Sequence, residues 1–313
     1  MKDGPVSYKD FLAAIPAEDR AALTARADGP GFRHLALYLG LIVVLAVLIV
    51  ARVPLWPVLM LPLGILLTFL FTLEHECTHK TPFASPRLNE AVGHLCGAVL
   101  IVPFRWFRYF HLAHHRWTNI AGRDPELAAP KPATRGAWLW HVSGVPHWRA
   151  MIGVTLRLAA GRERGDYLPE QARAGAAREA RLLLALYGLV ALSIIASPLA
   201  LWLWVVPMLI GQPFLRLYLL AEHGDCDHVT EMFANTRTTF TTRAVLFLAW
   251  NMPYHTEHHV WPMVPFHRLP DLHRRMKAHL RVTERGYARF TRAYLDRRGL
   301  LPGRGGQDRP DGV

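Results

Sequence analysis

The apolar residues of this 313-residue chain fall in long blocks, and the charged residues collect between and after those blocks. A helix needs ~20 consecutive apolar residues to cross the hydrocarbon core of a bilayer. Four blocks approach or reach that length: 35–53, 55–73, 182–197 and 199–220. This segregation predicts an all-α, multi-pass membrane protein, because the helices of a soluble core alternate polar and apolar positions within each turn.

Very short turns join these blocks in pairs. Only Arg52, Pro54 and their neighbours separate the first two blocks, and Ser197-Pro198 separates the last two. We therefore expect two transmembrane helical hairpins, with both termini and the middle segment on one side. That segment, residues 74–180, carries fourteen Lys or Arg residues, whereas the turns carry only Arg52. The positive-inside rule then places it, as a helical cap, in the cytoplasm.

The remaining segments are predicted from their composition. The stretch 88–103 is apolar but short for a crossing, so we expect it to be interfacial or re-entrant. A polar helix is expected at 169–181. Residues 1–33 form an N-terminal cytoplasmic segment, and the Gly- and Pro-rich residues 299–313 form a disordered tail. Between them, residues 34–280 form the core of a single membrane domain.

The net charge of +12 suits either nucleic acid or an anionic membrane surface. The arginines flank the apolar blocks and no nucleic-acid-binding motif is found, so a membrane partner is predicted and a nucleic-acid partner is not. Cys77, Cys96 and Cys226 are odd in number and far apart, which does not indicate a disulfide framework.

Eight of the seventeen histidines lie in three dense clusters at the ends of apolar segments. Residues at spacings i, i+3 and i+4 share one face of a helix, so each cluster aims its imidazoles at one region. A ninth candidate, His223, follows the fourth apolar block. The clusters are His75 and His79; His111, His114 and His115; and His255, His258 and His259.

Imidazole is a good ligand for iron, zinc and copper. A single zinc ion is usually four-coordinate, which leaves half of these histidines unused. Two iron ions with positions free for O2 would use all of them, so the pattern predicts a di-iron site with O2 as co-substrate. Ligating histidines need carboxylates or carbonyls to orient them. The candidates for this role, or for catalysis, are Glu76, Asp124 and Glu257, with Glu222 and Asp225 also adjacent.

The three clusters, HECTH, HLAHH and HTEHH, resemble the HxxxH, HxxHH and HxxHH boxes of the membrane fatty acid desaturase family. That family includes acyl-lipid desaturases and carotenoid hydroxylases and ketolases. The flanking runs RWTNIAGRDPEL and NMPYHTEHHVWPMVPFHRLP are also similar, and the resemblance covers about residues 35–280. It implies that the eight box histidines and His223 are iron ligands. An Asn that assists the site in acyl-CoA desaturases is Leu219 here, so that element is not carried over.

The resemblance implies an acyl-lipid desaturase that uses O2 and two electrons. A hydroxylase or ketolase of a carotenoid or other membrane lipid stays open, because the boxes are shared. No His-Pro-Gly-Gly motif of a fused haem domain is found, so a separate ferredoxin or flavin reductase is expected to supply electrons. The expected location is a bacterial inner membrane, with the site on the cytoplasmic side.

Two rival functions are weaker. HECTH also matches the HExxH motif of zinc proteases, with Glu76 as general base, but a protease leaves the other two boxes unexplained. A metal-ion transporter would place its site near the bilayer midplane, whereas the predicted clusters lie at the cytoplasmic edge.

Arg216 lies in the fourth apolar block, seven residues before His223. A charge within a membrane helix is costly and often functional. Near a helix end, however, a long side chain that reaches back to the interface is the more common case, and we expect that arrangement here.

Overall fold

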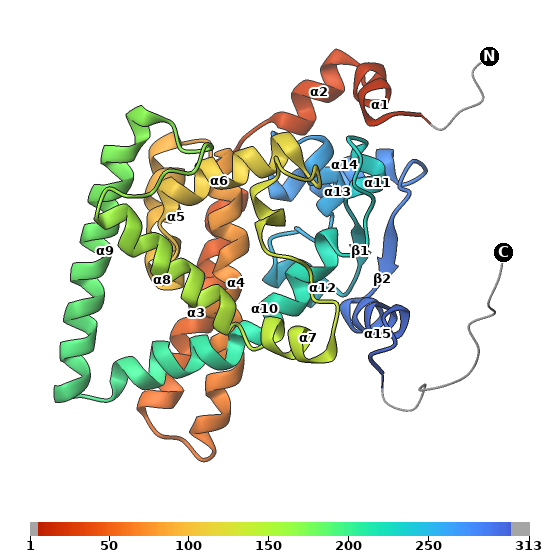
Figure 1. Ribbon diagram of the computed structural model, residues 1–313. Coiled ribbons are helices and arrows are strands. Elements are labelled where there is room, and N and C mark those ends of the chain that lie inside the picture. Colours follow the sequence, from red (N-terminus) through yellow and green to blue (C-terminus); the bar gives the residue numbers. More distant parts are fainter. Residues whose placement is uncertain (1–5, 302–313) are drawn as a thin grey trace.

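The computed structural model describes residues 6–301 and is mostly helical (Figure 1). Within these residues, four helical stretches are long and apolar enough to cross a membrane, which confirms the predicted number of spans. They are Ala17–Val50, Trp56–His79, Glu170–Ala196 and Leu201–His223. Most of the predicted disordered tail, residues 302–313, lies outside the described part of the chain.

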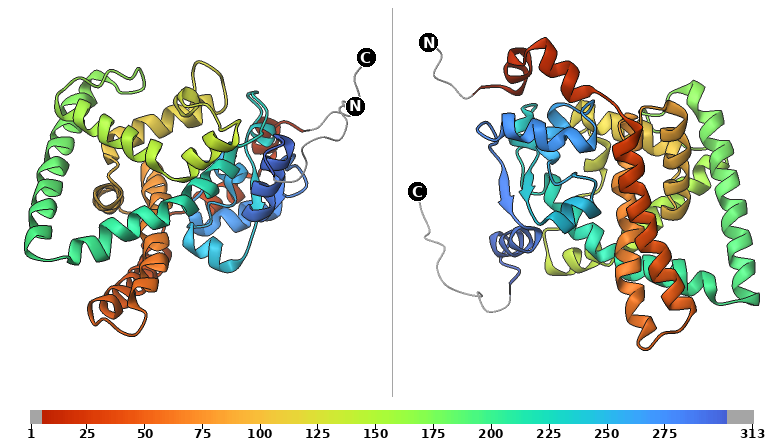
Figure 2. Two further views of the ribbon diagram at one scale, coloured as in Figure 1. Left: turned by 60° about the horizontal axis from the view of Figure 1, so that its bottom comes forward. Right: turned by 180° about the vertical axis from the view of Figure 1, so that it is seen from behind.

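The first two spans lie side by side and run in opposite directions (Figures 1 and 2). The Tyr38 hydroxyl joins them by donating to the carbonyl oxygen of Leu66 at 2.8 Å. The outer face of the first span is apolar and exposed, as expected for contact with lipid. The elements of this region are α1 (Tyr8–Ala14), α2 (Ala17–Thr24), α3 (Asp28–Val50), η1 (Trp56–Leu59) and α4 (Met60–His79).

The apolar stretch 88–103 forms a helix followed by a sharp bend. Helices α5 (Pro86–Leu100) and α6 (Phe104–Trp117) meet at 99°, the geometry of a broken span or a re-entrant loop. The carboxylate of Glu179, from α9 (Glu170–Ala196), accepts the backbone N–H groups of Phe104 and Arg105 at 3.0 Å each. A helix N-terminus has N–H groups without internal partners, so this carboxylate fixes the start of α6.

The predicted polar helix at 169–181 and the third span are one continuous helix, α9. No proline interrupts the junction at 181–182, so the helix continues from polar into apolar sequence. Two shorter helices, α7 (Arg135–Val142) and α8 (Val145–Ala159), connect α6 to α9, and α8 packs against α9.

The fourth span does not fold back along the third as the predicted second hairpin requires. After the π-helical turn η3 (Leu201–Val205), α10 (Val206–His223) crosses to pack against α4 (Figures 1 and 2). The backbones meet at glycines: a Cβ on Gly64 would lie 2.0 Å from the Pro207 carbonyl oxygen, and one on Gly211 would lie 2.2 Å from the Gly64 carbonyl oxygen. This close approach holds α10 against α4.

The C-terminal part carries the third histidine box and packs beside the ends of the spans (Figure 1). It contains two short parallel strands, in which Thr238 pairs with Thr283, so the all-α prediction missed a small sheet. Strands of three residues are too short to show an alternating pattern. The elements are α11 (Met232–Asn235), β1 (Thr238–Phe240), α12 (Arg243–Leu248), α13 (His255–Val260), η4 (Phe266–Arg268), α14 (Leu269–Met276), β2 (Thr283–Arg285) and α15 (Tyr287–Arg297).

The contact between α4 and α10 generates a stability prediction. Replacing Gly64 with Val should overpack the crossing and cost about 3 kcal/mol, so the melting temperature in detergent should fall by several degrees. Gly40→Val is the matched control, because a Cβ at Gly40 meets no atom within 4 Å. Equal melting temperatures for the two variants would contradict a tight backbone crossing.

Candidate metal centre

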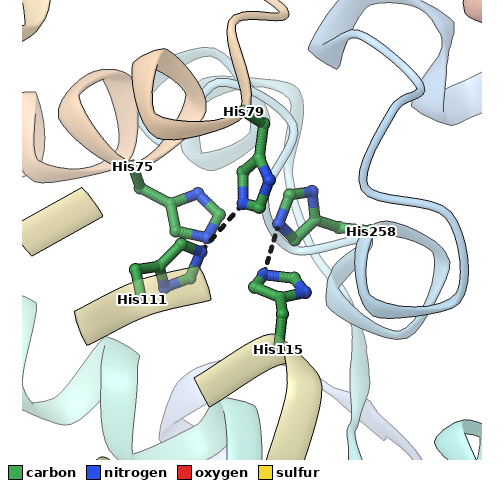
Figure 3. A group of neighbouring side chains, drawn as sticks. All are labelled: His75, His79, His111, His115 and His258. Atoms are coloured by element: carbon green, nitrogen blue, oxygen red, sulfur yellow. Dashed lines mark hydrogen bonds between the residues drawn. The ribbon is translucent and has the colours of Figure 1, made fainter. Parts of the chain in front are cut away.

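The predicted ligands converge in two adjacent groups, and the first contains five histidines (Figure 3). One ligand nitrogen from each lies within 4.8 Å of all the others. Their rings come from the end of α4, from α6 and from α13, so elements distant in the sequence build the group. The members are His75, His79, His111, His115 and His258.

The second group contains the other four histidines. Ring nitrogens of His114, His223 and His259 lie within 4.8 Å of one another. The Nε2 atom of His255 lies 2.9 Å from Nε2 of His223. All nine histidines predicted from the sequence are therefore brought together, and His223 at the end of α10 belongs to the second group.

The spacing of the nitrogens suits metal ions. The Nε2 atoms of His79 and His111 are 2.9 Å apart, and those of His114 and His223 are 3.2 Å apart. Two nitrogens each ~2.1 Å from one ion, at a right angle, would lie ~3.0 Å apart. Both ring nitrogens of His75 and Nε2 of His259 are buried without a hydrogen-bond partner. Buried polar atoms are normally paired, and a neutral imidazole has a free lone pair on one ring nitrogen, so these residues fit a metal that binds that nitrogen.

The ligands must be neutral to bind a metal. Burial, followed by the neighbouring histidines, lowers the pKa of His255, His258 and His259 well below the usual value. These rings are therefore neutral at cellular pH and ready to coordinate.

Asp124 orients one ligand directly. Its carboxylate lies 3.0 Å from Nδ1 of His114, at the start of the short helix η2 (Pro125–Ala128). Burial opposes ionisation of Asp124, but hydrogen bonds from His114 and from the backbone N–H groups of Asn119 and Glu126 outweigh it and lower the pKa. A carboxylate that is hydrogen-bonded to Nδ1 of a histidine leaves Nε2 of that ring free to coordinate a metal ion.

Other ligands are oriented by groups that the sequence did not single out. The His223 Nδ1–H donates to the carbonyl oxygen of Asn235 at 3.1 Å, and His259 Nδ1 lies 3.1 Å from the Thr118 hydroxyl. Asn235 lies in α11, and nothing in the sequence spacing marks it. Thr118 lies in the run RWTNIAGRDPEL after box two. In the sequence this run is marked only by its similarity to the family.

Among the flanking acids, Glu222 and Glu76 lie near ligand rings. A carboxylate oxygen of Glu222 is 3.4 Å from Nδ1 of His255, and one of Glu76 is 3.7 Å from Nδ1 of His258. The other Glu76 oxygen accepts from the Thr81 hydroxyl at 2.8 Å and the Phe266 N–H at 3.2 Å. Glu76 thus fixes the loop after α4 as well as facing a ligand.

Glu257 and Asp225 have other partners. Glu257 accepts from the Thr238 hydroxyl at 2.6 Å and pairs with Nδ1 of His273, so it joins α13 to β1 and α14. Asp225 pairs with Arg297 and Arg298 of the C-terminal segment. Glu257 therefore positions the helix that carries box three rather than an individual imidazole.

A cavity of about 450 Å³ adjoins the histidines. Residues of both groups line it, and so do aromatic and aliphatic side chains from α6 and α8. This arrangement places a largely apolar cavity beside the two groups of histidines. The apolar lining includes Phe71, Trp106, Phe107, Phe110, Met151 and Val154.

Four apolar helices of spanning length and nine convergent imidazoles define a helical membrane protein with a histidine-rich metal site. The chain belongs to the fatty acid desaturase family: the family model described as fatty acid desaturase matches residues 51–291.

Curated relatives carry related names. The chain is 29% identical over 177 residues to an sn-1 oleoyl-lipid 12-desaturase from Picosynechococcus, covering 51% of this chain and 48% of the relative. It is 33% identical over 104 residues to a Delta(12)-acyl-lipid-desaturase from Punica granatum, covering 33% and 27%. The matches thus span about half or less of the relatives' length.

The Asp124 contact generates a metal-affinity prediction. In Asp124→Asn the charge that orients His114 is lost, so affinity for the metal should fall by about 10- to 100-fold. Metal titration of the purified apoprotein measures this. Asp225→Asn, at a surface ion pair, is the control and should bind as the wild type does. An unchanged metal affinity in Asp124→Asn would show that His114 does not need the Asp124 carboxylate to be oriented for metal binding.

Proposed function

We propose that this chain is a membrane di-iron oxidoreductase, an acyl-lipid desaturase that uses O2 and two electrons to insert a double bond into a lipid acyl chain. The observation that carries the proposal is the pair of histidine groups beside a largely apolar cavity.

The donor set supports two iron ions. The group of five would hold one ion, and the group of three, with His255, would hold the other. Nitrogen-only ligation suits iron, zinc and copper, but nine ligands exceed the four of a usual zinc site. Bound iron would supply the activation of O2 that removing hydrogen from an unactivated C–H bond requires.

The protein residues would bind the acyl chain, orient the histidine rings and shield the site from water. The aromatic and aliphatic lining of the cavity would hold the acyl chain against the ligand rings and keep water out. Asp124, Asn235 and Thr118 contact Nδ1 of their histidines and so hold the rings in place. Glu76 and Glu222 face two further rings and are candidates for the same role.

The membrane arrangement follows from where the histidines lie. Box one ends α4 and box two ends α6, and both enter one cluster, so the segment between them leaves and returns to the same side. We therefore propose that α5 and α6 form a re-entrant unit. The basic middle segment, with the site, would face the cytoplasm of a bacterial inner membrane, where a separate ferredoxin or flavin reductase would supply electrons.

Hydroxylation or ketolation of a lipid is the second candidate, because the family that the chain resembles includes hydroxylases and ketolases with the same histidine boxes. The names of the relatives favour desaturation. A zinc protease fits less well, since the Glu76 carboxylate is engaged by Thr81 and Phe266 and does not line the cavity.

Metal analysis tests the di-iron assignment. Purified wild-type protein should hold two irons per chain, whereas His79→Ala and His259→Ala should each lose about one ion, because they lie in different groups. Elemental analysis measures this directly. A single zinc per chain in the wild type would overturn the proposal.

Lipid analysis tests the reaction. Mass spectrometry of total lipids from cells expressing the chain should show a product lacking two hydrogens, and His115→Ala should abolish it by removing a ligand. His228→Ala is the control, because His228 is exposed and lies outside both groups. A product that gains one oxygen instead would assign a hydroxylase with the same site.

A further inference from the structure

The cavity beside the histidines has a polar region in addition to its apolar lining. Arg216, His141 and His147 line it from α10, α7 and α8. Arg216 and His223 are seven residues apart on α10, so they lie on nearly the same helix face, about 10 Å apart along the axis. This region is therefore joined to the metal ligands by one rigid helix.

The Arg216 side chain has unused donors. Its Nε and Nη2 atoms are buried and have no hydrogen-bond partner, although the sequence led us to expect a side chain that reaches back to the interface. Nε2 of His141 is also buried without a partner, but a neutral imidazole has only one N–H, so the assigned unpaired donors are those of Arg216. Leaving buried N–H donors unpaired is costly, so a cavity that contains them is suited to a ligand with acceptor oxygens.

The other basic residues near Arg216 are either neutral or already hydrogen-bonded. Burial, with the charge of Arg216, lowers the pKa of His141 and His147, so both rings are neutral at cellular pH. The Lys131 ammonium donates to the His223 carbonyl oxygen. Glu126 and Glu222 also line the cavity. The ester carbonyl of the proposed acyl-lipid substrate is an acceptor of the kind that the unpaired Arg216 donors require.

The remaining lining suits a hydrocarbon chain. Along α8, His147, Met151 and Val154 lie on successive turns of one face, so the wall changes from polar to apolar in one direction. On α10, Leu219 and Leu220 separate Arg216 from His223. A molecule with a carbonyl head and an apolar chain matches both helices.

We propose that Arg216 binds the carbonyl oxygen of the substrate's acyl ester and thereby places the double bond at a constant number of carbons from that carbonyl. This inference rests on the proposed function. It adds that the enzyme recognises the ester carbonyl of the substrate, and that the position of the double bond is set by its distance from that carbonyl. His141 also lines the cavity, and its electrostatic interaction with Arg216 places it beside this polar subsite.

The test uses the full-length chain in cells fed saturated fatty acids of increasing length, including odd-numbered chains. Mass spectrometry locates the new double bond in each product. The wild type should place it at one distance from the carbonyl for every chain length. Arg216→Gln should lower the yield by at least about tenfold and spread the residual product over neighbouring positions, because a charged hydrogen bond is lost. Arg216→Lys should keep the position, with an intermediate yield.

Two controls separate this inference from a folding defect. Arg243→Gln, an exposed arginine at the start of α12, should match the wild type in yield and position. Iron content should be unchanged in Arg216→Gln, since Arg216 lies in neither histidine group. Loss of iron in that variant would assign Arg216 a structural role and overturn the inference.

Other outcomes are also decisive. A double bond at a constant distance from the methyl end, or an Arg216→Gln variant with wild-type yield and position, would overturn the Arg216 subsite while leaving the desaturase intact. If the wild type inserts oxygen, the position of that oxygen is read in the same way. A wild type that changes no lipid would overturn the proposed function itself, and the subsite with it.

Discussion

The structure depends on nine imidazoles gathered in one place, eight of them buried and His115 half-buried. Buried ring nitrogens without partners are unfavourable, and several are present, including both nitrogens of His75. A metal ion bound to one nitrogen of such a ring would offset part of that cost. The ends of α4, α6 and α10 and the short helix α13 all meet at this point. Bound metal would therefore stabilise the meeting of four segments that are far apart in the sequence.

The rest of the fold sets the positions of those four segments. The glycine contact between α4 and α10 brings His223 beside the boxes. Glu179 of α9 fixes the start of α6, and Glu257 ties α13 to the small sheet and to α14. Buried carboxylates thus act mainly as structural links between elements, and Asp124 is the one that pairs closely with a ligand.

The position of the cavity follows from the same helices. Its apolar wall comes mainly from α6 and α8, with contributions from α4 and α10, and its polar region comes from α7, α8 and α10. Because α10 carries both Arg216 and His223, the separation between the polar subsite and the metal ligands is set by helix geometry rather than by a flexible loop. Such a rigid spacing is what a site needs in order to act on one carbon of a long and uniform chain.

The sequence by itself determined the number of apolar spans, the eight box histidines and the ninth at His223, because apolar length and helical spacing are local properties. Only the tertiary structure decided how the nine divide into groups of five and four, since that depends on how α4, α6, α10 and α13 meet. It also decided that α10 crosses α4 instead of pairing with α9, that Asn235 and Thr118 contact two of the nine histidines, and that Glu257 joins α13 to β1 and α14. These are contacts between residues up to about 140 positions apart, and spacing along a chain carries no information about them.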